Sequence, residues 1–123
     1  MKFISFLNQD QEERLGLWYE GKTFDLAKSA EHLDIQIPST MMAFLQNSEE
    51  NLGKIKRVFT QIKKGELEEN ADVQKKLAPL PKPNSCRDAY AFRQHVETMR
   101  RNRGAEMIPE FDQFPVFYFT NHN

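Results

Sequence analysis

The stretch SCRDAYAFRQHVETMRRNRG, Ser85 to Gly104, decides how the second part of the chain is organised. Ser85 and Asp88 have the S-x-x-D spacing of a helix capping box, and Gly104 follows a group of arginines, as is usual where helices end. We therefore predict one helix over the whole stretch. At about 100° per residue its apolar side chains share one face, and Asp88 and His95 fall on that face, one above the other.

Two interpretations of Asp88 and His95 are open at this point. An acid and an imidazole on the apolar face of a helix are costly to desolvate unless they are paired or bound to something. In the first interpretation Asp88 is the capping partner of Ser85, and His95 is a core histidine with ordinary hydrogen bonds. In the second, Asp88 is a ligand of a hard cation and His95 is a general base beside it. The spacing alone does not decide between them.

An ordered series of motifs in the same part of the chain carries a family resemblance. The motifs are D-x-Y-x-x-x-x-H, R-G and P-V-x-Y, and they lie at Asp88–His95, Arg103–Gly104 and Pro115–Tyr118. The series resembles the segment that opens the catalytic domain in the fumarylacetoacetate hydrolase family. The resemblance covers about the last third of the chain, and the order of the motifs makes it more specific than any one of them.

The resemblance implies a metal-dependent hydrolase that cleaves carbon–carbon bonds in acylpyruvates and related 1,3-dicarbonyl compounds. It implies that Asp88 is a ligand of a divalent metal, Mg²⁺ or Ca²⁺, and that His95 activates a water molecule. Tyr90, Arg103 and Tyr118 would then contact the substrate, a small diketo acid. The parent protein would be a homodimer, and the remainder of its catalytic domain would pack against this segment.

Only part of such a site is present in the sequence. Mg²⁺ and Ca²⁺ take about six or more oxygen ligands, and the family supplies the others from a Glu-x-Glu pair and an Asp further along the chain. Glu66-Leu67-Glu68 has this spelling but precedes Asp88, so we interpret it as a coincidence. We expect an N-terminal fragment of such a hydrolase, which has no activity and holds no metal by itself. The alternative is a non-catalytic α+β folding or interaction module in which Asp88 and His95 are structural.

The composition excludes several other classes of protein. Lys and Arg number 17 and Asp and Glu number 18 in 123 residues, so charge gives no reason to expect a nucleic-acid partner. No apolar run reaches membrane-spanning length, and the first residues lack the pattern of a signal peptide. Cys86 is the only cysteine, so no intrachain disulfide is possible and a cytoplasmic location is expected.

The first part of the chain predicts a small antiparallel β meander followed by helices. Alternating apolar residues indicate strands over residues 2–7, 15–19 and 23–26. A short helix is expected from Asp25 or Ser29 to Leu33. A long helical stretch is expected after a cap at Ser39, broken at 47–48 or at Gly53. Its core face is predicted to consist of Met41, Leu45, Leu52, Ile55, Phe59 and Ile62.

The middle of the chain predicts a loop and a domain boundary. Residues 65–76 are charged and predict a loop, with a helical turn at 73–77, and the proline-rich segment after residue 77 is expected to run extended. We predict an α+β domain over 1–78, and a linker with the first helix and strand of a mostly-β catalytic domain over 79–123. The aromatic run 114–120 predicts a strand buried on both faces, which needs more strands than the chain contains. This too favours a longer parent protein.

Overall fold

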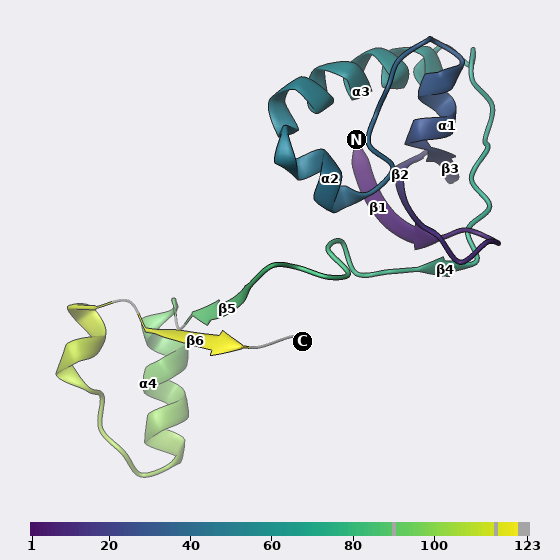
Figure 1. Cartoon of the computed structure of the whole chain (residues 1–123). Coiled ribbons are helices and arrows are strands. Elements are labelled where there is room, and N and C mark those ends of the chain that lie inside the picture. The colour runs from purple at the N-terminus through teal and green to yellow at the C-terminus, as the bar shows by residue number, and fades with distance from the viewer. Residues whose placement is uncertain (90, 115, 121–123) are drawn as a thin grey trace. The chain divides into compact units, whose positions relative to one another are not determined.

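The computed structural model describes residues 1–89, 91–114 and 116–120. The chain divides into two compact units, Met1–Pro81 and Lys82–Asn123 (Figure 1). Residues 79–81 belong to the first unit, where Ser5 Oγ donates a hydrogen bond of 2.9 Å to the Pro79 carbonyl. Within the described residues, no helix is both long and apolar enough to cross a membrane.

The first unit is built on a four-stranded antiparallel sheet with the order β3-β2-β1-β4. The strands are β1 (Lys2–Leu7), β2 (Glu13–Tyr19), β3 (Lys22–Asp25) and β4 (Lys75–Lys76). The first three form the predicted meander, and together with the helices they confirm the α+β class. The helical turn predicted at residues 73–77 is wrong, because Lys75 and Lys76 pair with β1 instead.

Three helices follow the meander: α1 (Leu26–Glu31), α2 (Met41–Gln46) and α3 (Ser48–Lys63). The carboxylate of Asp25 caps α1 by accepting a hydrogen bond from the Lys28 amide at 3.2 Å. Thr40, one residue after the predicted Ser39, caps α2 through the Ala43 amide. The break between α2 and α3 falls at Asn47 as predicted, whereas Gly53 lies inside α3.

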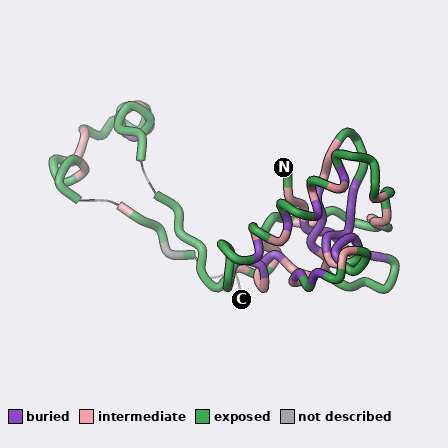
Figure 2. The backbone as a smooth tube through the Cα atoms, turned by 90° about the horizontal axis from the view of Figure 1, so that it is seen from above, coloured by how far each residue is buried: buried purple, intermediate pink, exposed green. Residues whose placement is uncertain are grey.

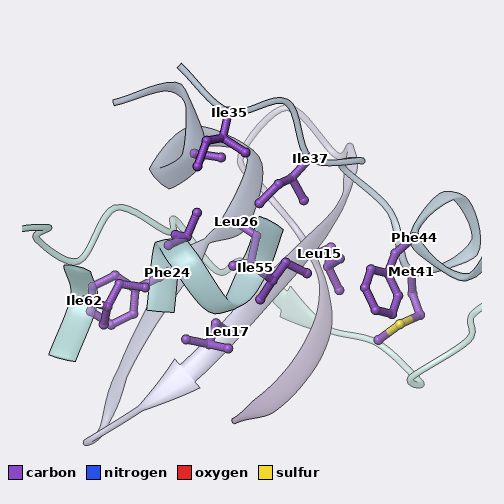
Figure 3. Packing of buried hydrophobic residues seen from close by; sticks show 12 residues of the cluster. Leu15, Leu17, Phe24, Leu26, Ile35, Ile37, Met41, Phe44, Ile55 and Ile62 are labelled. Atoms are coloured by element: carbon purple, nitrogen blue, oxygen red, sulfur yellow. The ribbon is translucent and has the colours of Figure 1, made fainter. Parts of the chain in front are cut away.

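The core of the first unit lies between the sheet and the helices. Leu15 and Leu17 of β2 pack with Phe24 of β3, and helix α3 contributes Ile55 and Ile62 (Figure 3). The predicted helical face is correct for α3 but wrong at Leu45 of α2, whose side chain is 47% exposed. The turn at Asn47 separates the phases of the two helices, so Phe44 enters the core in its place.

One segment, residues 69–77, covers both open edges of this sheet. At the β3 edge, the side chains of Glu69 and Asn70 accept hydrogen bonds of 2.8 Å from backbone amides of β3. At the β1 edge, the amides of Gln74 and Leu77 donate to carbonyls of β1 at 2.9 and 2.8 Å. An uncovered edge strand is a template for pairing with another chain, so this segment protects the sheet on both sides.

The second unit contains β5 (Cys86–Ala89), α4 (Arg93–Asn102), the 3₁₀ helix η1 (Pro109–Asp112) and β6 (Phe117–Thr120). Strands β5 and β6 form an antiparallel pair (Figure 1). The single helix predicted from Ser85 is therefore wrong over its first part. Pairing with β6 holds residues 86–89 extended, and the helix begins only after Phe92, whose backbone is also extended. Its predicted end is correct, since Gly104 has the positive φ of +72° that favours glycine there.

Strand β6 is not buried on both faces as predicted. Phe117 and Tyr118 are 47% and 57% exposed, because β5 is the strand that pairs with β6 and no second layer covers the pair in the described residues. Phe114 is 64% exposed, and Val96 is the buried hydrophobic residue among those described in this unit. Buried positions are concentrated in the first unit (Figure 2).

Candidate functional site

Strand register brings two of the predicted site residues together in the second unit. Asp88 of β5 lies directly opposite Tyr118 of β6 in the antiparallel pair. Residues that are directly opposite point to the same face of a sheet, with Cβ atoms about 4.5–5.5 Å apart. Asp88 and Tyr118 are both exposed. This face of the strand pair therefore presents an acid next to a phenol.

Helix α4 brings the other two together. His95 lies in its first turn and Arg103 is its C-cap residue, and both line a cavity of about 140 Å³. The wall of this cavity is otherwise mostly apolar. It consists of Val96, Met99, Arg100, Ile108, Phe111 and Val116. His95 and Arg103 are both exposed, so a molecule that enters the cavity from solvent can contact both side chains.

The predicted stacking of Asp88 and His95 on one helical face is wrong. Asp88 belongs to a strand and His95 to the helix that follows, so their spacing of seven residues does not span two helical turns. The structural interpretation of the pair is also wrong in its details. Asp88 caps no helix, and the His95 side chain is exposed instead of buried in a core. Tyr90, the remaining predicted substrate contact, lies outside the described residues, as does Pro115 of the family motif.

Two contacts that the sequence did not predict fix α4 against the chain that follows it. Arg93 Nη1 lies 3.2 Å from Asp112 Oδ2 of η1. Arg100 Nε donates a hydrogen bond of 2.6 Å to the Glu106 carbonyl. These contacts hold η1 and the preceding loop beside the helix, and so they form the cavity wall. The two partners are nineteen residues apart in the first contact and six residues apart in the second, so no periodic pattern in the sequence predicts either contact.

Asp88 fits one position in the coordination sphere of a hard cation, because it offers an accessible carboxylate. The described residues contain no group of three or more His, Cys, Asp or Glu side chains arranged to hold a metal ion. Arg103 and His95 are unsuited to a Mg²⁺ or Ca²⁺ sphere, which prefers oxygen ligands. Within the described part of the chain, the site can therefore offer a single metal ligand.

Comparison of the chain with family models, with curated proteins and with solved structures finds no match.

Proposed function

We propose that this chain contributes part of the active site of a metal-dependent hydrolase that cleaves carbon–carbon bonds in acylpyruvates and related 1,3-dicarbonyl compounds, as in the fumarylacetoacetate hydrolase family. The observation that supports this most is the pairing of the motif residues. Asp88 faces Tyr118 across β5 and β6, and His95 and Arg103 line one cavity in the same unit. A shared active site requires such proximity between its residues.

The proposed role of Asp88 is to supply one carboxylate ligand to a divalent cation, Mg²⁺ or Ca²⁺. A bound cation of this kind polarises the carbonyl group under attack. Because such ions take about six or more oxygen ligands, further carboxylates must come from outside the described residues. We use the term complete hydrolase for the protein that joins these 123 residues to those carboxylates. By themselves, the 123 residues are expected to be inactive and to bind the metal weakly.

His95 is the proposed general base, which takes a proton from the attacking water. Its side chain is exposed and has no hydrogen-bond partner among the described residues, so it is free to meet a water molecule or a substrate. Arg103 suits the carboxylate of the diketo acid, because a guanidinium can donate two parallel hydrogen bonds to one carboxylate. Tyr118, and Tyr90 by the same motif, are proposed to contact the substrate.

A second candidate is a non-catalytic folding or interaction module. It is favoured by the distribution of the core, since nearly all buried hydrophobic residues belong to the first unit and the described residues of the second are mostly exposed. In that case Asp88 and His95 have no common function. The two candidates differ in what they predict for substitutions at these residues.

The proposed function is tested by the metal dependence of acylpyruvate hydrolysis in the complete hydrolase. Asp88→Asn should raise the concentration of Mg²⁺ or Ca²⁺ needed for half-maximal activity by about tenfold or more, because it removes a charged ligand. Glu97→Gln is the matched control. Glu97 is an exposed acid on α4 that does not line the cavity, so its replacement should leave the metal dependence unchanged. An Asp88→Asn variant with the parent's metal dependence would contradict the proposal.

A further inference from the structure

The cavity beside α4 is lined mostly by apolar side chains, which we call its floor, and by three basic side chains, which we call its rim. Val96, Met99 and Phe111 are among its apolar lining residues. Its three ionisable lining residues, His95, Arg100 and Arg103, are all bases, and no acid lines it among the described residues. A single water molecule needs about 10–15 Å³ of such space, so a cavity of about 140 Å³ admits a chain of several carbon atoms.

Of the two arginines at the rim, Arg103 is the one available to a ligand. Arg100 Nε is already engaged with the Glu106 carbonyl at 2.6 Å. Arg103 has no side-chain hydrogen bond or ion pair among the described residues, and its side chain is exposed. An anion at the rim would therefore gain charge-assisted hydrogen bonds from Arg103 without breaking existing ones. An apolar tail below it would displace water from an apolar wall, which is favourable in proportion to the area covered.

We propose that this cavity binds the apolar acyl group of the substrate, so that the enzyme prefers acylpyruvates with a short aliphatic acyl chain over those whose acyl group carries a second carboxylate. This inference rests on the proposed function. It adds to it a binding site for the aliphatic tail that extends from the acyl carbonyl group under attack. A second carboxylate in the tail would have to enter the apolar floor, and burying a charge without a partner is costly.

The chemistry of the reaction supplies a probe for this cavity. In the proposed hydrolysis, R–CO–CH₂–CO–COO⁻ and water give R–COO⁻, pyruvate and a proton. The hydroxyl of water bonds to the acyl carbon, the adjacent carbon–carbon bond breaks, and the leaving carbon takes a proton to become the methyl group of pyruvate. A fatty acid such as hexanoate is therefore a reaction product. In the chain without substrate, Arg103 is not engaged by the carboxylate of the diketo acid, so the tail of hexanoate belongs in the cavity and its carboxylate at the rim, beside Arg103 and His95.

The test is titration of the isotope-labelled 123-residue chain with sodium hexanoate, followed by amide NMR shifts. We expect saturable shifts in α4 and η1, with a Kd on the order of 1 mM for a ligand of this size. Three other ligands should each bind at least about tenfold more weakly, since each loses either the apolar contact or the charge match. Acetate lacks the tail, hexylamine has a cation in place of the carboxylate, and succinate has a second carboxylate.

Three variants locate the binding. Arg103→Gln should weaken hexanoate binding by about tenfold or more, the value of a lost hydrogen bond to a charged group. Arg101→Gln, at an exposed arginine of the same helix outside the cavity, should not. Met99→Gln should weaken the binding of hexanoate and leave the binding of acetate unchanged. The inference is overturned if the amide signals of the cavity residues do not shift, or if hexylamine or succinate binds as tightly as hexanoate. It is also overturned if Arg101→Gln weakens hexanoate binding as much as Arg103→Gln does. Such a failure, combined with acylpyruvate hydrolysis by the complete hydrolase, would leave the proposed function intact.

Discussion

Replacement of Arg14 by methionine is expected to destabilise the first unit by about 3 kcal/mol, because it leaves a buried carboxylate without its counter-ion. Arg14 Nε and Nη2 donate hydrogen bonds of 2.8 and 3.0 Å to the two carboxylate oxygens of Asp25. The Asp25 side chain is 2% exposed. The hydrogen bond to Asp25 raises the pKa of Arg14 above its ordinary value, against the desolvation that lowers it.

The magnitude follows from what remains around Asp25 in the variant. Breaking a buried ion pair by removal of one partner costs about 3–5 kcal/mol. Asp25 would keep its hydrogen bond from the Lys28 amide at the start of α1, which places the expected loss at the lower end of that range. Methionine retains most of the aliphatic part of Arg14, so lost packing contributes little. Adding Asp25→Asn should recover part of the loss, because asparagine also caps helices and carries no charge.

Urea denaturation followed by tryptophan fluorescence measures this loss. Trp18 is the only tryptophan of the chain and lies on β2, so its signal reports the first unit. Arg57→Met, at an exposed arginine on α3, is the control and should change the stability by no more than about 0.5 kcal/mol. A loss below about 1 kcal/mol for Arg14→Met would refute the reasoning, since it would mean that the buried carboxylate does not need its counter-ion.

Further predictions concern the same unit. Ile55→Ala should lower its stability by about 2–5 kcal/mol in the same urea assay, because the side chain is fully buried and its removal leaves a cavity. Gly16→Ala should cost about 1–3 kcal/mol, since a Cβ there would lie 3.0 Å from side chains of β1. Gly53→Ala, in open space within α3, should instead stabilise by about 0.5–1 kcal/mol, and equal effects of the two alanines would contradict the packing described. The hydrogen bond from Lys54 lowers the pKa of Glu50 below its ordinary 4.5. The small stabilisation from this pair should therefore be complete above pH 4.5 and should be lost as the pH falls through the lowered pKa. The melting temperatures of the parent and of Lys54→Met should differ above pH 4.5 and should become equal once the pH lies below the lowered pKa of Glu50.

The first unit could be predicted from the sequence because its signals are local. Alternation over residues 2–7 predicts β1, and the helical period over residues 48–63 predicts the buried face of α3. The prediction that Leu45 is buried is wrong, because the turn at Asn47 separates two helices whose apolar faces are not in phase. A periodic pattern continued through the turn does not reveal this change of phase. Strand β4 could not be predicted, because its two lysines have no apolar pattern and pair with β1 through the backbone.

The second unit was predicted less well because a long-range contact overrides a local one. The S-x-x-D pattern favours a helix start at Ser85, but residues 86–89 pair with a strand about thirty positions later. A strand partner satisfies the backbone hydrogen bonds of the segment, and no capping signal reports that such a partner exists. The motif did identify residues that the structure brings together in pairs. Their arrangement depends on strand register and on the end of α4, which motif spacing does not contain.

The central claim, that His95 acts as the general base of a hydrolase, is tested most directly by the turnover of His95→Ala in the complete hydrolase with an acylpyruvate substrate. General base catalysis contributes about 10²–10⁴-fold to the rate, so kcat should fall by that factor. Because the imidazole is exposed and makes no hydrogen bond among the described residues, the melting temperature and the metal affinity should stay close to those of the parent. Gln94→Ala, at the exposed neighbouring position, should keep the parent's kcat. Near-native turnover in His95→Ala would contradict the assignment of His95 as the base.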